Sequence, residues 1–123
     1  GAVYEGQWKN NHQHGRGKYT WANNDVYDGE WKDGRMNGQG IMRQADGVKF
    51  KGTFKDGLKD GYGVLEDADG IRYEGNFCEG QKDGEFVEKD RNGNVIRKVT
   101  YVKGLVQSVS ENAGNVASTD KKD

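Results

Sequence analysis

One aromatic and glycine pattern recurs along the chain with a constant period of 23 residues, and this period constrains the fold more than any other feature. The first position of each unit is Tyr4, Tyr27, Phe50 or Tyr73. The fifth position is Trp8, Trp31, Phe54 or Phe77. Because self-similarity at a fixed period is the signature of repeat architectures, we expect an array of stacked units. The units span residues 4–26, 27–49, 50–72 and 73–95.

Glycine also recurs in register, and its replacements indicate two different roles. At unit positions 8 and 21 only Asn replaces Gly, as in Asn11 and Asn24, so these positions are predicted to be turns with a left-handed backbone. At positions 3, 12 and 14 we expect a bare floor, on which each aromatic ring covers the glycines of the next unit. The predicted structural glycines are Gly6, Gly15, Gly17, Gly29, Gly38, Gly40, Gly52, Gly61, Gly63, Gly75 and Gly84.

Within each unit, polar and aromatic residues alternate with the period of a β-strand, for example in YDGEWK at 27–32 and GQGIMR at 38–43. A five-residue loop, DGRMN at 33–37, is predicted to join the two strands, and a second turn leads into the next unit. A helix is disfavoured by so many glycines. The predicted fold is all-β: an elongated, curved, single-layer antiparallel sheet of stacked hairpins with about 8–10 strands.

The composition fits a thin but ordered domain in a reducing compartment. Three Trp and six Tyr supply bulk that the aliphatic residues lack, and 19 basic residues nearly balance 20 acidic ones. The single cysteine, Cys78, excludes an intramolecular disulfide and favours a cytoplasmic location, including a cytoskeletal or membrane-peripheral one. The sequence starts at Gly1 without an initiator Met, so we expect a fragment of a longer protein.

The repeated stretch YDGEWKDGRMNGQG at 27–40 resembles the MORN repeat (membrane occupation and recognition nexus), whose units read approximately YxGxWxxGxxxGxG. The resemblance covers residue 4 to about residue 95. It implies hairpins stacked into a curved single-layer sheet. It also implies a role in binding, positioning or oligomerisation, while any catalysis lies elsewhere in the chain.

The C-terminal part departs from the repeat. Phe86 replaces a glycine of position 14 and is expected to close the slot for a ring. A degenerate unit at 96–106, one residue out of phase, is predicted to cap the array of residues 1–106. Residues 107–123 read as a polar tail that is either flexible or a short segment for partner docking.

The aromatic face is the strongest candidate for a binding site, because Tyr and Trp are frequent interface anchors. A partner peptide or helix is expected to lie in this aromatic groove, and the sheet edges are expected to allow homodimers or end-to-end association. The alternative is that the rings only fill each other's glycine slots as a core. The candidate residues are Tyr4, Trp8, Tyr19, Trp21, Tyr27, Trp31, Phe50, Phe54, Tyr73 and Phe77.

Other functions have weaker support from the sequence. His12 and His14 lack the further ligands of a zinc site, and no cofactor motif or catalytic constellation is expected. The net charge of −1 and the absence of dense basic clusters disfavour nucleic acid and weaken the case for anionic lipid. We therefore expect a non-enzymatic scaffolding module. The alternatives are an accessory region of a larger enzyme, such as a lysine methyltransferase or a phosphatidylinositol-phosphate kinase, and a phospholipid-headgroup module.

Overall fold

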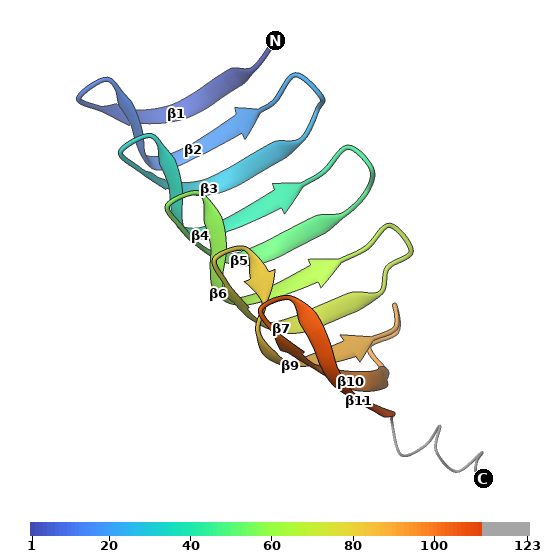
Figure 1. Ribbon diagram of the computed structural model, residues 1–123. Helices are drawn as coiled ribbons and strands as arrows, with labels where there is room; N and C mark the ends of the chain where they lie inside the picture. The colour runs from blue at the N-terminus through green and yellow to red at the C-terminus, as the bar shows by residue number, and fades with distance from the viewer. Residues whose placement is uncertain (112–123) are drawn as a thin grey trace, which may run out of the picture.

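The computed structural model describes residues 1–111, which form one open antiparallel sheet (Figure 1). The strands lie side by side in sequence order, except that β9 pairs with β7 and the two-residue β8 pairs only with β7. The strands are β1 (Val3–Lys9), β2 (His12–Thr20), β3 (Val26–Lys32), β4 (Arg35–Arg43), β5 (Lys49–Lys55), β6 (Leu58–Glu66), β7 (Arg72–Cys78), β8 (Gln81–Lys82), β9 (Gly84–Lys89), β10 (Val95–Val102) and β11 (Leu105–Glu111). The predicted all-β array of stacked hairpins is confirmed.

The hairpin turns are tighter than expected, as the second unit shows. Only Asp33 and Gly34 separate β3 from β4, and their φ values are 50° and 84°. Two consecutive left-handed residues give a type I′ turn, whose twist matches that of the flanking strands. The expected five-residue loop at 33–37 is therefore wrong, because β4 already begins at Arg35.

A bulge of three residues opposite one follows each of the first three hairpin turns. In the second unit, Trp31 pairs with Met36, and the next pair is Gly29 with Gly40, so one residue of β3 opposes three residues of β4. Gly38, in the middle of the bulge, has a φ of 100°. Position 12 thus requires glycine for a left-handed backbone, and its expected role as part of the floor under a ring is wrong.

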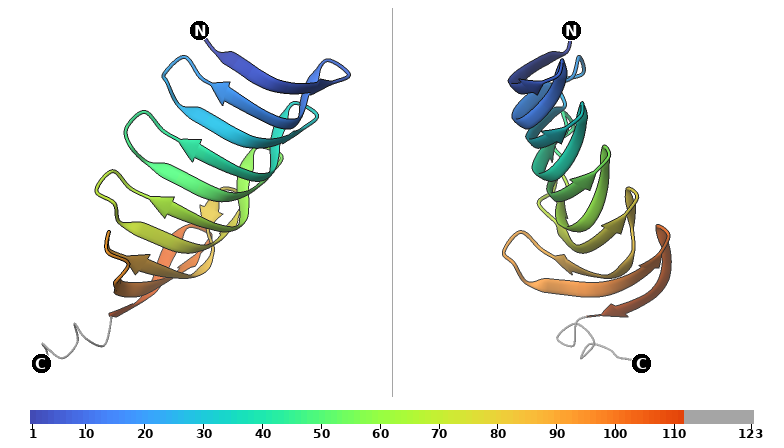
Figure 2. Two further views of the ribbon diagram at one scale, coloured as in Figure 1. Left: turned by 180° about the vertical axis from the view of Figure 1, so that it is seen from behind. Right: turned by 90° about the vertical axis from the view of Figure 1, so that its left-hand side faces the viewer.

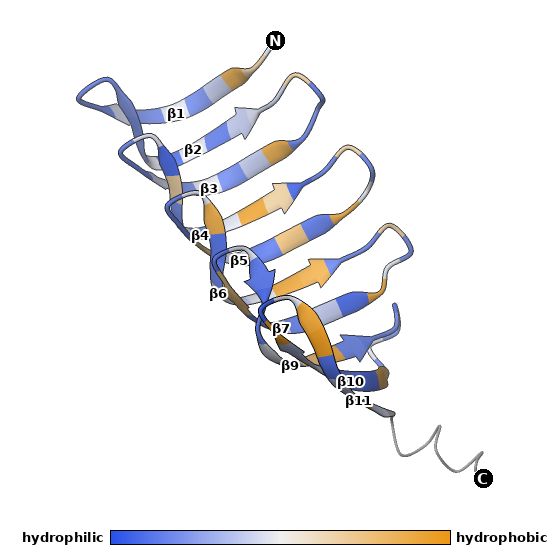
Figure 3. Cartoon of the chain, viewed as in Figure 1, coloured by the Kyte–Doolittle hydropathy of each residue, from blue (hydrophilic) through white to orange (hydrophobic). Residues whose placement is uncertain are grey.

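The bulges bend the strands, because extra residues on one side of a pair increase local curvature and twist. Figure 2 shows the curved strands stacked along the molecule, so that the sheet forms an open trough. Polar residues are interspersed with apolar ones along the strands (Figure 3). The buried residues are few and mostly aromatic, and they lie on one face of this single layer.

The C-terminal hairpin is longer than expected. It consists of β10 and β11, and β11 continues to Glu111. The boundary at residue 106 is therefore placed too early, because residues 107–111 continue β11 and residues 108–111 pair with β10. Alternation in this strand is hidden by its serines and valines, which carry no glycine or aromatic marker. The rest of the expected tail, residues 112–123, lies outside the described residues.

Candidate functional site

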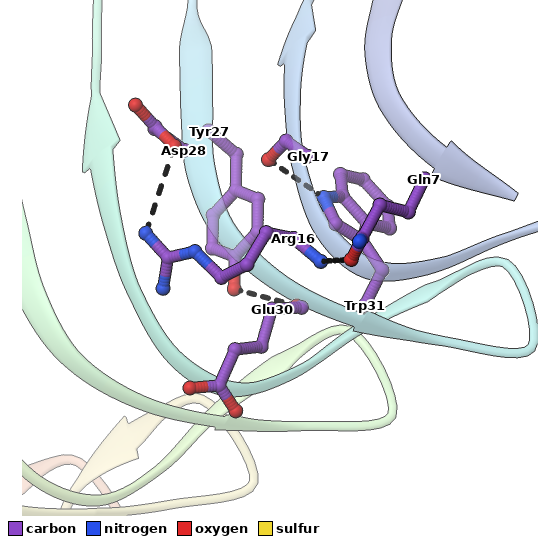
Figure 4. Close-up of polar contacts among 7 residues, drawn as sticks. All are labelled: Gln7, Arg16, Gly17, Tyr27, Asp28, Glu30 and Trp31. Carbon is purple, nitrogen blue, oxygen red and sulfur yellow. Dashed lines mark hydrogen bonds and ion pairs between the residues drawn. The ribbon is translucent and has the colours of Figure 1, made fainter.

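The aromatic ring at position 1 lies on the glycines of its own unit. Tyr27 extends over Gly29 and Gly40, and a Cβ atom added to Gly40 would overlap its ring. The Tyr27 hydroxyl donates a hydrogen bond of 2.9 Å to the backbone oxygen of Glu30 (Figure 4). The expectation that each ring covers the glycines of the next unit is wrong, because the ring runs along its own hairpin.

The aromatic ring at position 5 connects neighbouring units. The indole Nε1 of Trp31 donates a hydrogen bond of 3.0 Å to the backbone oxygen of Gly17 in the preceding unit (Figure 4). The Trp31 ring lies edge-on to Tyr27, at 5.2 Å between centroids, and to Tyr4, at 5.5 Å. Such edge-to-face pairs are each worth about 0.5–1.5 kcal/mol beyond burial. Position 5 is therefore the link between successive hairpins.

This alternation continues through the molecule as one chain of edge-on contacts, which we call the aromatic ladder. Successive centroids along it are 4.9 to 5.5 Å apart. In order, the ladder consists of Trp8, Tyr4, Trp31, Tyr27, Phe54, Phe50, Phe77, Phe86 and Tyr101.

Half of the predicted aromatic groove is core. Five of its ten residues are buried, at 0 to 6% exposure: Tyr27, Trp31, Phe50, Phe54 and Phe77. These rings offer little surface to a partner. Four others are partly buried against them: Tyr4, Tyr19, Trp21 and Tyr73. Only Trp8, at 58%, is largely exposed.

Side chains at position 10 cover the ladder towards its C-terminal end. The Nζ atom of Lys59 lies 5.1 Å from the centroid of Phe50, and that of Lys82 lies 4.6 Å from Tyr73 and 4.9 Å from Tyr101. Burial lowers the pKa of Lys59, and the charge of Lys82 lowers it further. The two lysines lie over the rings through their apolar stems and through cation–π contacts. Their ammonium groups therefore cover this part of the aromatic face and limit the access of a partner to it.

The open aromatic surface lies instead between the first two units, where a shallow pocket of about 310 Å³ is found. We call it the aromatic pocket. Tyr19 and Trp21 form one wall, with their ring centroids 4.7 Å apart. The pocket is lined by Gly34 and Gly57, which lie in hairpin turns, and also by Trp21, which lies at the other end of the strands. It therefore lies on the concave side of the curved sheet. Its lining residues are Gln13, Tyr19, Trp21, Trp31, Gly34, Arg35, Met36 and Gly57.

Comparison with protein families bears on the repeat itself. The family model of the MORN repeat matches three consecutive units, at residues 4–26, 27–49 and 50–72, which make up more than half of the chain. The chain belongs to the MORN repeat family. Repeats of this kind mediate interactions with proteins or membrane lipids. A search of curated proteins gave no match. Within the described residues, no helix is long and apolar enough to cross a membrane.

The fourth unit, at residues 73–95, keeps the aromatic ladder through an exchange of rings that the sequence did not predict. Phe86, on β9, is fully buried, and its ring lies against Gly75. It thus occupies the seat that the position 1 ring holds in the first three units. Tyr73 is displaced, and its hydroxyl donates a hydrogen bond of 3.1 Å to Oδ2 of Asp67. The sequence does contain a signal for this exchange, because Phe86 is an aromatic residue at a position where the first three units have glycine.

The other face of the first two MORN units carries a polar hollow of about 500 Å³. The backbone nitrogen of Arg16 donates a hydrogen bond of 2.8 Å to Oε1 of Gln7 there (Figure 4). Arg16 also lies 4.0 Å from Asp28, but both side chains are about half exposed or more, so this ion pair is weak. His14 lines the hollow, and no group of three His, Cys, Asp or Glu residues among residues 1–111 could hold a metal ion.

Proposed function

We propose that this chain is a non-enzymatic protein-interaction module that holds a peptide or helix of a partner protein in the aromatic pocket. The proposal is supported by the family, whose repeats mediate interactions, and by the pocket itself. The observation that carries it is the partly exposed Tyr19–Trp21 pair, which sits beside Met36 at the open end of the ladder.

The chemistry of the pocket favours an apolar anchor on the partner. Tyr and Trp supply large rigid contact area with few rotatable bonds, and Met adapts its shape to what it contacts. Arg35 lies at the same pocket and can pair with a carboxylate beside the anchor. A segment with one large apolar residue next to an acidic one therefore fits best. A concave, mostly apolar site with a few polar groups is the usual form of a specific binding pocket.

The proposal extends to location and context. The free thiol of Cys78 fits the reducing cytoplasm, where a scaffold of this kind would act at the cytoskeleton or at a membrane surface. The same pocket would serve if the module were an accessory region of a larger enzyme, because it would then position the catalytic part against its substrate.

A displayed library of random peptides, selected on the immobilised chain, tests the proposal. We expect the selected peptides to share an apolar anchor and to lose at least tenfold in affinity on Trp21→Ala, as buried aromatic anchors do. Tyr62→Ala is the matched control, since Tyr62 is an exposed aromatic residue on the opposite face. Peptides that bind the Trp21→Ala variant as well as the original would refute the pocket.

Vesicles of phosphatidylserine or phosphoinositide, mixed with the same proteins, distinguish the membrane alternative. If the chain binds headgroups, it will co-sediment with the vesicles, and binding will weaken as salt rises. Co-sedimentation without selectable peptides would replace the protein-binding proposal.

A further inference from the structure

The inner wall of the trough changes from neutral to basic along the array at unit position 10. This position lies directly opposite the position 5 ring of the same hairpin. Its residues in the four units are Gln13, Met36, Lys59 and Lys82. Gln13 and Met36 line the aromatic pocket, and the two lysines continue the same row beyond it. The pocket is therefore one end of a longer surface whose other end is positively charged.

The two ammonium groups of this row lie over aromatic rings, and both lysine side chains are partly buried. The Nζ atom of Lys59 is 5.1 Å from the ring centroid of Phe50 and 5.8 Å from that of Phe77. Burial lowers the pKa of Lys59, and the charge of Lys82 lowers it further. Cation–π contacts offset part of the lost hydration of an ammonium group, but they do not remove the repulsion between two like charges.

The described part of the chain supplies no counter-charge to these ammonium groups. Among residues 1–111, no ion pair involves either lysine. Glu88 lies opposite Tyr73, and its Oε1 atom is 2.9 Å from Nε of Arg97. Asp67 accepts a hydrogen bond of 3.0 Å from the backbone nitrogen of Ile71 and one of 3.1 Å from the Tyr73 hydroxyl. Both carboxylates beside Tyr73 are therefore already engaged.

We propose that Lys59 and Lys82 bind carboxylates of the same partner segment whose apolar anchor occupies the aromatic pocket. This role of the two lysines rests on the proposed function, and it makes the partner an acidic peptide that lies along the trough, across successive hairpins. A carboxylate beside the ammonium groups would accept charge-assisted hydrogen bonds and reduce the repulsion between them. A basic segment would increase that repulsion and is disfavoured.

The repeat of the sheet gives the spacing of the partner's side chains. Equivalent positions in successive units lie two strands apart, which is about 9–10 Å. Three residues of an extended or polyproline II peptide span about the same distance. With the anchor beside Met36, carboxylates about three and six residues away would therefore reach Lys59 and Lys82 in turn. The expected partner sequence is an apolar residue with acidic residues at this spacing.

Synthetic peptides with a single tryptophan as the anchor test this arrangement by fluorescence anisotropy. One peptide has glutamates three and six residues after the tryptophan, another has them before it, and matched peptides carry glutamine instead. We expect one of the two glutamate peptides to bind the full chain about threefold or more tightly than its glutamine counterpart, with a difference that shrinks as salt rises. The absence of this preference in both directions overturns the role of the lysines.

Replacement of the lysines by methionine tests whether they cause the preference. Lys59→Met with Lys82→Met places at each site the residue that the second unit has as Met36, so the fold should tolerate the change. In this double variant the glutamate and glutamine peptides should bind equally. Lys55→Met is the matched control, because Lys55 is exposed and follows Phe54 on the opposite face of the strand. A preference that persists in the double variant, or is lost in the control, overturns the proposal.

NMR of the lysine side chains separates this role from that of the aromatic pocket. The glutamate peptide at millimolar concentration should shift the Hε–Cε resonances of Lys59 and Lys82 more than the glutamine peptide does. If these resonances do not respond while Trp21→Ala weakens both peptides, the role of the lysines is overturned and the pocket stands. If they respond while Trp21→Ala changes neither affinity, the pocket is refuted and the lysines still bind carboxylates.

Discussion

The glycines of one unit illustrate that a single residue type has three physical roles in this molecule. Gly34 adopts the left-handed backbone of the hairpin turn, and Gly38 adopts that of the bulge. Gly29 and Gly40 have no positive φ, and their role is to leave room for the ring of Tyr27. Sequence alone separates the turn from the strand, because Asn substitutes only at turns. It does not separate the bulge from the seat, since both positions are glycine in the first three units.

This difference predicts unequal costs for the same substitution. Gly40→Ala places a methyl group inside the Tyr27 ring, and we expect it to cost about 3 kcal/mol or more of the free energy of unfolding. Gly57→Ala, in a hairpin turn with open space around it, should cost only about 1–2 kcal/mol through its φ of 86°. Gly57→Asn should cost less still. Urea unfolding of the three variants measures this, and equal costs at Gly40 and Gly57 would contradict the ring-seat interpretation.

At the scale of strand pairs, one interface differs from the others in the type of side chains that meet across the strands. In the first three interfaces between units, position 16 and the next position 1 form an apolar or aromatic cross-strand pair, such as Leu65 with Tyr73. Between β9 and β10 the equivalent pair is Glu88 with Arg97, with Oε1 and Nε 2.9 Å apart. The Glu88 side chain is only 6% exposed. An ion pair thus replaces two large side chains just before the last hairpin.

The ion pair should be replaceable as a unit but not in part. Arg97→Tyr removes a cation from a nearly buried carboxylate, and we expect it to lower the free energy of unfolding by about 2 kcal/mol, less than for a fully buried pair because Arg97 is 44% exposed. The double variant Glu88→Leu with Arg97→Tyr recreates the Leu65–Tyr73 pair and should recover most of that loss. A double-mutant cycle of urea unfolding, which compares Glu88→Leu, Arg97→Tyr and the double variant with the original chain, measures the coupling energy between the two side chains. Additive costs would show that the two side chains are energetically independent.

For the whole molecule, the burial of a side chain depends on which unit of the array it belongs to as well as on its position within that unit. Trp8 and Trp31 are the same unit position, but only Trp31 has a unit on both sides. We expect Trp31→Ala to lower the free energy of unfolding by about 3–5 kcal/mol and Trp8→Ala to lower it by about 1 kcal/mol or less. Thermal and urea unfolding of the two variants compare them. Similar losses would contradict the role of neighbouring units in burying position 5.

The sequence prediction is wrong or incomplete where the surroundings of a residue are set by another unit or another strand. Period and alternation predict hairpins, their order and the shared aromatic face, because each of these is set within one unit. Whether Trp31 is a contact residue or a core residue depends on Tyr4 and Gly17, which belong to another unit. The length of β11 depends on pairing with β10, and the role of Phe86 depends on a vacant seat over Gly75. Each of these features depends on contacts between strands, which the residue pattern along one strand does not predict.

The seat of Tyr27 over the glycines of its own hairpin has a consequence for how such proteins change over time. Each unit brings both the ring and the place for it, and the first three interfaces between units use the same register, so a duplicated unit inserted between two others would meet equivalent strands on both sides. Growth or loss by whole units therefore keeps the pattern of contacts between neighbouring hairpins, while the side chains that meet at the new junction can change. The length of the trough can therefore vary in steps of one hairpin.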